Sequence, residues 1–295
     1  MSFLRLYLET SRPKTLIASV APIAIVGVFH LKAALLNFSL YVSILSATIL
    51  IQILTNYFND YYDLIQKQDT CDRVGPKRPF QRGDLNQKDM KKSLLILSLI
   101  YVILTLPIIK RLGFFGFFIS CLAYLLSIYY TKGNYSLAKL GLSDIFSFAF
   151  FGPLATGICG FALTGNLQAA DFILGGATGA LSTTLLVVNH LRDEEEDRKN
   201  QKTTTVVRFG PKFGKVLVYL FINLVRAIPI LIFSMKLANV LAIMLIFVVS
   251  HIFVLQFQTC KTAQNYGEFL KLAALHFFIQ TSLYLYLAWN STIIS

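Results

Sequence analysis

Long apolar runs separated by short polar segments dominate this chain. A transmembrane helix needs about 20 mostly apolar residues. Nine stretches of the 295-residue sequence approach that length: 15–36, 39–58, 93–110, 113–131, 144–165, 172–190, 213–234, 237–257 and 272–290. The pattern predicts an all-α polytopic membrane protein with nine transmembrane helices.

The composition supports this interpretation. The chain is 55% hydrophobic and 14% charged, with a mean hydropathy of +0.62, whereas soluble domains carry roughly 25% charged residues. The first apolar stretch passes through "VAPIAIVGVF" without a persuasive cleavage site, so we interpret it as a retained first span. We expect a single membrane domain over residues 1–295.

The basic residues predict the orientation. With a cytoplasmic N-terminus, the segments on the inside hold 22 Lys and Arg and those on the outside hold four. This asymmetry agrees with an odd number of helices and with the positive-inside rule. The net charge of +12 is thereby explained without nucleic acid. We expect a multi-pass protein of the cell inner (cytoplasmic) membrane, in contact with the lipid bilayer.

Cysteines and histidines give no sign of a disulfide framework or a zinc site. Cys71, Cys121, Cys159 and Cys260 show no C-x-x-C spacing, and the four histidines form no ligand pair at helical spacing.

Acidic residues gather at the cytoplasmic ends of two predicted helices. The loops 60–92 and 191–212 contain 11 of the 15 acidic residues. Residues three and four apart share one face of a helix, so "NYFNDYYD" and "NHLRDEEED" each form a polar stripe. The members of the stripes are Asn56, Asn59, Asp60 and Asp63 in the first, and Asn189, Asp193 and Asp197 in the second. The offset from Asn56 to Asn189 and from Asp60 to Asp193 is 133 residues in both cases, which hints at two related halves.

Such stripes suit a divalent metal and a phosphate group. Clustered carboxylates repel one another unless a cation lies between them, and hard oxygen ligands favour Mg²⁺, which also binds substrate phosphates. Nearby basic residues can meet the remaining phosphate charge: Arg73, Lys77, Arg78, Arg82, Arg192, Arg198, Lys199 and Lys202. At the mouth of an apolar bundle, this combination indicates a lipid with a diphosphate head. The alternative for either segment alone is a solvated helix end with i,i+4 ion pairs, and Glu194 and Glu195 are assigned to such a face.

"NDYYD" and "RDEEED" resemble the paired aspartate motifs of the UbiA superfamily of intramembrane prenyltransferases, and the similarity runs over nearly the whole chain. "SRPKTLIASVAPIAIVG", "NDYYDLIQKQDTCDRVGPKRPFQRGDL", "GLSDIFSFAFFGP" and "NHLRDEEEDRKNQKTTTVVRFG" resemble the branch that prenylates 1,4-dihydroxy-2-naphthoate in menaquinone synthesis. Lys67 stands where the superfamily usually has another Asp, and Asp69-Thr70 matches an Asp-Thr pair of this branch. The chain differs from the residues usual in this branch at three positions, His190, Gln201 and Thr203.

The resemblance implies helices around a central cavity under a cytoplasmic cap, with two Mg²⁺ holding an allylic diphosphate. An aromatic acid would be prenylated with loss of CO₂ and diphosphate, giving a demethylmenaquinone. The expected partners are a polyprenyl diphosphate and a soluble aromatic acid, with no required protein partner evident. We expect Asn59, Asp60, Asp63, Asp193 and Asp197 to hold metal and diphosphate, the four aspartates being catalytic. Supporting substrate-binding residues are Asn56, Asp69, Arg73, Arg78, Lys132 and Asn189.

Other interpretations stay open. A secondary transporter would place its polar site near the bilayer midplane, whereas these carboxylates lie at one face. Another UbiA-type acceptor, 4-hydroxybenzoate or haem, is separated only by the branch resemblance. Lys132 can also be an ordinary cytoplasmic lysine. Arg226, alone inside the seventh predicted span, is a functional candidate by default but can instead snorkel or bind a carbonyl, and we leave it out of the site.

Overall fold

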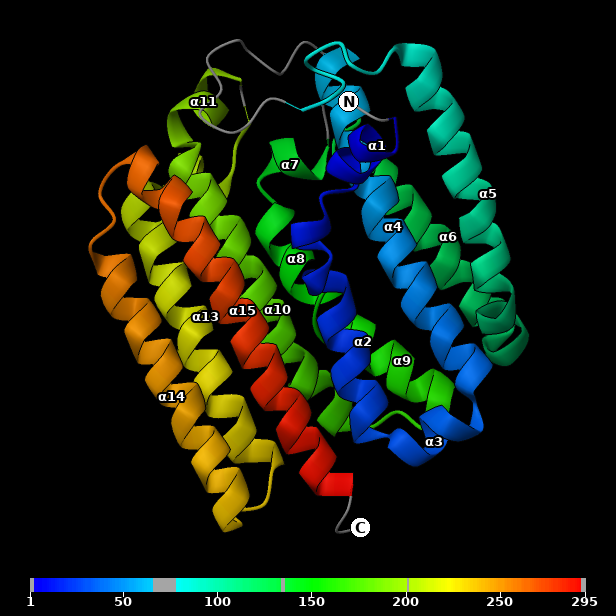
Figure 1. Ribbon diagram of the computed structural model, residues 1–295, viewed down its shortest axis with the longest axis vertical. Helices are drawn as coiled ribbons and strands as arrows, with labels where there is room; N and C mark the ends of the chain where they lie inside the picture. The colour runs from blue at the N-terminus through cyan, green and yellow to red at the C-terminus, as the bar shows by residue number, and fades with distance from the viewer. Residues whose placement is uncertain (1–2, 66–77, 134–135, 201, 293–295) are drawn as a thin grey trace.

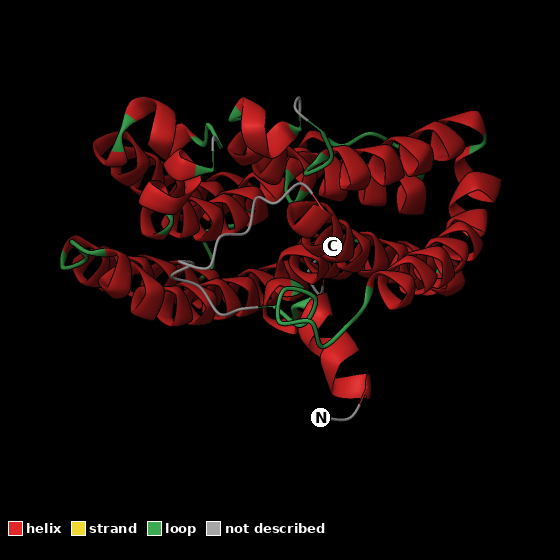
Figure 2. Cartoon of the chain, turned by 90° about the horizontal axis from the view of Figure 1, so that it is seen from above, coloured by secondary structure: helices red, strands yellow, loops and turns green. Residues whose placement is uncertain are grey.

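The computed structural model describes residues 3–65, 78–133, 136–200 and 202–292. These residues form helices and turns, without a strand (Figures 1 and 2). In chain order the elements are α1 (Phe3–Ser11), a 3₁₀ turn (Pro13–Thr15), α2 (Ile17–Phe29), α3 (Leu31–Leu36), α4 (Phe38–Ile65), α5 (Gln87–Leu112), α6 (Phe114–Tyr129), α7 (Leu137–Leu140), α8 (Ser143–Phe150), α9 (Pro153–Thr164), α10 (Ala169–Arg192), α11 (Glu194–Lys199), α12 (Thr205–Phe209), α13 (Pro211–Ile232), α14 (Leu237–Gln258) and α15 (Ala263–Thr292).

Seven spans within the described ranges are long and apolar enough to cross a membrane. They are α4, α5, α8 with α9, α10, α13, α14 and α15. An eighth candidate, residues 5–29, bends by 57° between its two halves, and α6 is a shorter apolar helix of 16 residues. The all-α prediction is confirmed. The predicted count of nine is not established. The first predicted span falls on α2, which is one half of the bent pair, and the fourth is the short helix α6.

Several helix boundaries differ from the sequence-based expectation. α4 continues to Ile65 rather than 58 because its last turns bury Tyr57, Phe58 and Tyr61 against α1 and α5. The predicted loop 191–212 contains α11 and α12. α5 begins at Gln87, six residues before the expected start, since Asn86 and Asp89 form a capping box at its N-terminus.

The span over residues 143–164 breaks between α8 and α9 because Gly152 leaves the helical region and Pro153 starts a new helix. This break allows close contact with α10. A Cβ atom on Gly152 would lie 2.5 Å from the carbonyl oxygen of Gly175, and one on Gly179 would lie 2.3 Å from the carbonyl oxygen of Phe148. Backbone therefore packs directly on backbone, and α10 is the most buried of the candidate spans.

The core consists of two main packing units. The first joins α1, α4, α5 and α6 through residues such as Leu54, Met90 and Tyr101. The second joins α2, α10, α13, α14 and α15 through residues such as Leu181, Val225 and Phe277. α2 and α9 also pack against α4, and so connect the units. The C-terminal ends of α4 and α10, where the two acidic motifs lie, belong to different units and reach the same end of the molecule (Figure 1).

Candidate active site

The first acidic motif occupies the last turns of α4. Asn56, Asp60 and Asp63 are all buried, at 3%, 3% and 5% exposure. The other side of these turns carries tyrosines that fix the helix: the Tyr57 hydroxyl donates to the Tyr7 carbonyl at 2.9 Å, and Tyr61 stacks on Phe80. Aromatic packing thus holds a carboxylate stripe away from bulk water, where ionised carboxylates need a cationic partner.

Two arginines neutralise Asp60. Arg12 and Arg78 both donate to Asp60 Oδ1, and Arg78 Nη1 also lies 3.3 Å from Asp63 Oδ2. Within the part of the chain that the structure describes, Asp60 Oδ2 has no hydrogen-bond partner. Arg12 adopts a left-handed backbone conformation with φ 52°, which is uncommon for a residue other than glycine. Sequence reasoning included Arg78 in the site but did not assign Arg12, although it belongs to the quoted "SRPKT" segment.

α1 and the segment after residue 77 form a strap over this motif. Asn56 Nδ2 donates to the Ser11 carbonyl at 2.9 Å, and Arg82 Nη1 lies 2.8 Å from Glu9 Oε1. The hydrogen bond from Arg82 lowers the pKa of the Glu9 carboxyl. The strap brings Arg12 and Arg78 to the same carboxylate although they are far apart in sequence. Asn59 instead faces the turn after α6, where the Thr131 hydroxyl donates to its Oδ1.

The second motif continues the predicted stripe across a helix end. α10 stops at Arg192, and Asp193 is its C-cap. The backbone amide of Asp193 bonds to the Asn189 carbonyl at 2.9 Å, and that of Asp197 bonds to the Asp193 carbonyl at 2.8 Å. The four-residue spacing is therefore kept into α11.

The second-motif carboxylates differ in their partners. Arg192 donates twice to Asp193, with both distances 2.6 Å. Asp197 is buried, and burial raises the pKa of its carboxyl to about 6, with a further rise from Asp193, while His190 and Lys202 oppose it. Asn189 donates to the Leu185 carbonyl of its own helix, at 3.0 Å. The Glu194 carboxylate pairs with Arg198 at 3.0 Å, in keeping with the solvated face assigned to it.

A buried group that sequence reasoning missed supports the second motif. Asp144 of α8, at 4% exposure, lies with Oδ1 3.2 Å from His190 Nδ1 and accepts a hydrogen bond from the Thr205 hydroxyl. These contacts connect α8, α10 and α12 beside Asp197. Asp144 lies within the quoted "GLSDIFSF" segment, but a single Asp at a helix start carried no sign of its partners.

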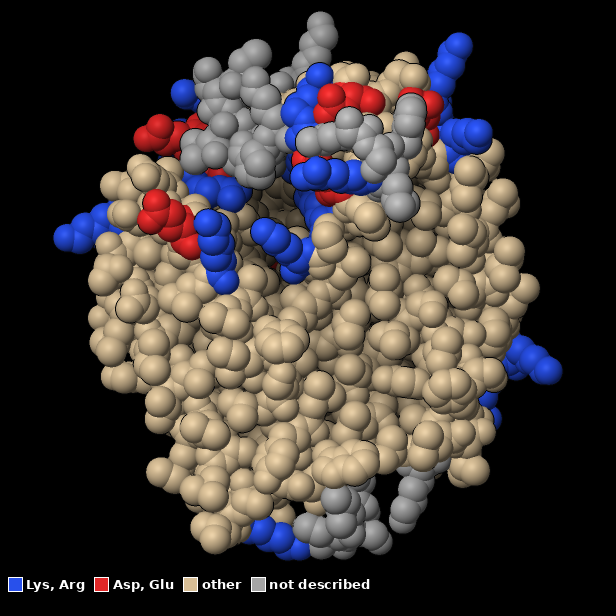
Figure 3. All heavy atoms as spheres, in the orientation of Figure 1, with Lys and Arg blue, Asp and Glu red and all other residues tan. Residues whose placement is uncertain are grey.

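The charges of both motifs act on Tyr130, the C-cap residue of α6. Burial raises the pKa of its hydroxyl, and Asp63, Asp144 and Asp197 add to this effect while Arg12 opposes it. Tyr130 is therefore within electrostatic reach of both acidic stripes. Lys132 follows it and places its ammonium 5.7 Å from the Tyr62 ring and 5.9 Å from the Tyr129 ring. Lys132 itself is exposed. Charged side chains on the visible face gather mainly at this end of the molecule, above a broad uncharged belt (Figure 3).

The carboxylates of the two motifs suit a metal ion that also binds oxygens of the substrate. The buried carboxylates of the motifs are suited to a hard cation, and among them Asp60 has an oxygen without a hydrogen-bond partner in the described residues. No cluster of three His, Cys, Asp or Glu ligands occurs in the described residues. Each motif can thus offer one or two carboxylates, the number with which Mg²⁺ is usually held when phosphates and water complete its shell. Asp69 and Arg73 lie outside the described residues.

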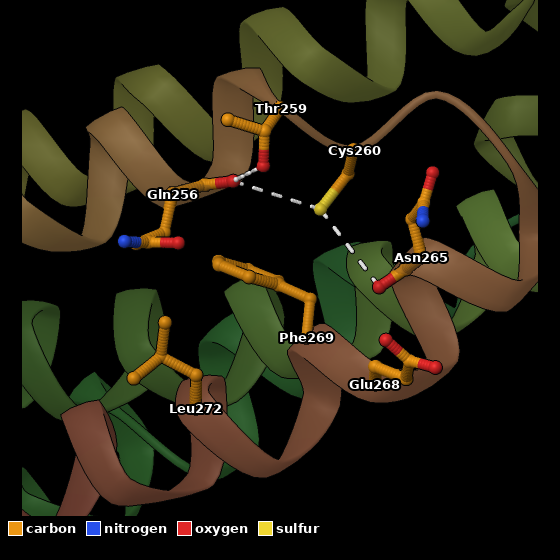
Figure 4. A pocket seen from close by; sticks show the side chains of 7 residues that line it. All are labelled: Gln256, Thr259, Cys260, Asn265, Glu268, Phe269 and Leu272. Atoms are coloured by element: carbon orange, nitrogen blue, oxygen red, sulfur yellow. Dashed lines mark hydrogen bonds between the residues drawn. The ribbon is translucent and has the colours of Figure 1, made fainter.

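A cavity of about 250 Å³ lies elsewhere, at the turn between α14 and α15 (Figure 4). It contains no residue of either motif. Its Cys260 thiol contacts the Gln256 and Asn265 carbonyls at 3.7 and 3.9 Å. These contacts are with the backbone of the turn itself and indicate a structural role for the thiol.

Known proteins resemble this chain over most of its length. It is 36% identical to the 1,4-dihydroxy-2-naphthoate octaprenyltransferase of Escherichia coli, over 69% of this chain and 68% of the relative. For the enzyme of the same name from Haemophilus influenzae, the identity is 32% over 72% of each chain. A solved UbiA homolog from Archaeoglobus fulgidus, bound to DMAPP and Mg²⁺, shares the fold with a TM-score of 0.60 at 17% identity, covering 94% of this chain and 99% of the homolog. Residues 20–280 match the UbiA prenyltransferase family. The chain belongs to that family.

Proposed function

We propose that this protein transfers a polyprenyl group from an allylic diphosphate to 1,4-dihydroxy-2-naphthoate. Diphosphate and CO₂ leave, and the reduced (quinol) form of a demethylmenaquinone is formed. The observation that carries the proposal is the pair of carboxylate stripes, on α4 and on α10–α11, in which Asp60, Asp63 and Asp197 are buried. Relatives that carry the naphthoate octaprenyltransferase name at 36% and 32% identity support this acceptor.

Asp60, Asp63, Asp193 and Asp197 would hold Mg²⁺ together with the diphosphate oxygens, and Asn59 would assist. Bound there, Mg²⁺ would stabilise the negative charge that develops on the leaving diphosphate. Arg12 and Arg78, which contact Asp60, are placed to turn toward added phosphate oxygens. Lys132 could meet the same charge from the opposite side. Asn56 and Asn189 would act by holding the motif helices, since both side chains bond to carbonyls.

The reaction breaks the bond between the allylic carbon and the diphosphate oxygen, and the bond electrons leave with the diphosphate. The electron-rich ring carbon that bears the carboxylate attacks the allylic carbon. The carboxylate then leaves as CO₂, and its bond electrons restore the aromatic ring. The protein must keep water from the allylic cation. Aromatic faces beside the first motif, such as the stacked Phe58 and Tyr62, can stabilise that cation.

For the membrane arrangement we propose nine crossings: the seven long spans, the segment 15–36 that contains α2, and α6. The acidic motifs and the N-terminus would face the cytoplasm, in the inner membrane, with the α1 strap and α11–α12 covering the site. The basic-residue asymmetry of 22 to four supports this orientation.

Product analysis tests the proposal directly. Purified protein with Mg²⁺, a polyprenyl diphosphate and equal amounts of 1,4-dihydroxy-2-naphthoate and 4-hydroxybenzoate should give mainly a decarboxylated prenyl naphthoquinol. The bicyclic acid buries more apolar surface, and even a methylene-sized difference changes selectivity by about 1–3 kcal/mol. A main product that retains its carboxylate and derives from 4-hydroxybenzoate would reject the naphthoate assignment while keeping prenyl transfer.

A further inference from the structure

Arginine side chains occupy the carboxylates that the proposed function assigns to the metal in the first motif. Arg12 and Arg78 both donate to Asp60 Oδ1. Arg78 Nη1 also lies 3.3 Å from Asp63 Oδ2. The side chains of the two aspartates are only 2% and 7% exposed. A buried carboxylate that releases its arginine needs another cation in its place, because an unpaired buried charge is costly.

The second motif repeats this arrangement with an arginine of its own. Arg192 donates from Nε to Asp193 Oδ1 and from Nη2 to Asp193 Oδ2, with both distances 2.6 Å. This is the bidentate pairing that a guanidinium favours with a carboxylate. It engages both oxygens of Asp193. A metal ion bound at either oxygen would lie beside the guanidinium and be repelled by it, so the two cations compete for one carboxylate.

The same guanidinium groups are suited to phosphate oxygens, which accept the same bidentate hydrogen bonds as a carboxylate. Metal alone would bring positive charge to carboxylates that arginine already neutralises. Diphosphate alone would meet arginines that are engaged with aspartates. Added together, the metal and the diphosphate nearly cancel each other's charge, and each binds the group that the other sets free.

We propose that the arginines of the two motifs compete with the metal for the aspartates, so that metal and diphosphate bind tightly only together. Each arginine exchanges its aspartate for phosphate oxygens, and each aspartate exchanges its arginine for metal. The inference rests on the proposed function, because it uses the metal and the diphosphate assigned there. By linkage, diphosphate tightens metal binding by the same factor by which metal tightens diphosphate binding. The arginines of the set are Arg12, Arg78 and Arg192.

Loss of Arg192 therefore has opposite effects on the two ligands. Without its competitor, the metal alone should bind about tenfold more tightly, a factor within the usual range of coupling between sites. Diphosphate in the presence of metal should bind about tenfold more weakly, since one of its donors is gone. An arginine that served diphosphate alone would leave the binding of metal alone unchanged when it was removed.

Equilibrium dialysis against the purified protein in detergent measures both affinities. The probes are Mn²⁺, which takes the same oxygen ligands as Mg²⁺, and labelled inorganic diphosphate. Mn²⁺ is titrated alone, and diphosphate is titrated in an excess of Mg²⁺. Arg192→Gln should show the tighter binding of Mn²⁺ and the weaker binding of diphosphate. Arg192→Lys keeps the charge without the bidentate geometry, so both of its affinities should lie between those of Arg192→Gln and the unaltered protein.

Arg208→Gln is the matched control for a general change of charge. Arg208 belongs to α12, which contacts α11, and is exposed, with its guanidinium 5.4 Å from the Phe209 ring. This variant should bind both ligands as the unaltered protein does. Unchanged or weaker binding of Mn²⁺ alone by Arg192→Gln would overturn the proposal. Equal tightening in Arg208→Gln would also overturn it, because the effect would then be long-range charge and not competition.

Folding and the proposed function are tested separately from the competition. Thermal unfolding shows whether each variant is folded, and Arg78→Gln, which should also bind Mn²⁺ alone more tightly, repeats the test in the first motif. No binding of Mn²⁺ by the unaltered protein, even with diphosphate, would reject the metal site of the proposed function and the competition with it. A product from another aromatic acid would revise the proposed function and leave the competition standing.

Discussion

His190 Nδ1 of α10 lies 3.2 Å from Asp144 Oδ1 of α8. This contact joins two helices that meet beside the second acidic motif. Because Thr205 of α12 also donates to Asp144, one carboxylate fixes α8, α10 and α12 relative to one another. The position of Asp197 therefore depends on a residue outside the motif.

Asp144→Asn should lower activity by roughly 10- to 100-fold, the usual effect of losing a residue that orients metal ligands. It keeps the side-chain volume but removes the charge facing His190. The Mg²⁺ concentration for half-maximal activity should rise in the same variant. Glu195→Gln, an exposed carboxylate of α11, is the control. Unchanged Mg²⁺ dependence in Asp144→Asn would show that Asp144 has no part in positioning the motif.

Asp60→Asn and Asp193→Asn should each reduce turnover by orders of magnitude, with normal membrane insertion. Each exchange removes one charged ligand and keeps the shape. Glu194→Gln should retain activity, since Glu194 pairs with Arg198. Steady-state rates with and without EDTA provide the measurement. Full activity of either Asp variant, or in EDTA, would contradict the diphosphate-site assignment.

Mg²⁺ affinity should fall as the pH drops below about 6. Burial raises the pKa of the Asp197 carboxyl to about 6 in the metal-free protein, so below that pH a proton competes with the metal. Each pH unit lost below this value should weaken apparent affinity up to tenfold. Titration calorimetry with Mg²⁺ and diphosphate at several pH values measures this. The slope should be absent in Asp197→Asn, and an equal slope there would assign the titration to another group.

Arg12→Gln should destabilise the metal-free protein more than the protein with Mg²⁺ and diphosphate. Arg12 is one of two cations on buried Asp60, and loss of a hydrogen bond to a buried charge costs about 1–3 kcal/mol. Bound metal would supply the missing charge. Thermal unfolding with and without ligands gives the comparison. An equal loss in both states would mean that Arg12 and the metal do not share Asp60.

Lys199 and Lys236 should lie on opposite sides of the membrane. Each is exposed, on α11 and immediately before α14, and the proposed arrangement separates them by one crossing, α13. Cysteines introduced singly at these positions, in a variant without the four native cysteines, can be labelled from either side. Labelling of both from the same side would make the proposed topology wrong.

The sequence predicts the helical fold and both stripes because these depend on local periodicity. The long apolar runs can be read from the sequence without any knowledge of tertiary contacts. The same holds for the four-residue spacing within the motifs that contain Asp60 and Asp193. The pairing of Arg12 with Asp60 and of Asp144 with His190 is not visible, since these residues are 48 and 46 positions apart. The break at Gly152 was also missed, because its cause is the backbone of α10. The choice of acceptor rests on the resemblance to the naphthoate branch and not on the chemistry of individual residues.

The two acidic motifs lie on separate packing units, one built around α4 and the other around α10. A diphosphate held by both motifs, as proposed, would therefore be a cross-link between the units as well as a reactant. Its binding free energy would add to the stability of the folded protein by mass action, and its departure would release that cross-link. Product release would then also loosen the contact between the two units, and the substrate would serve as a temporary structural element of the enzyme.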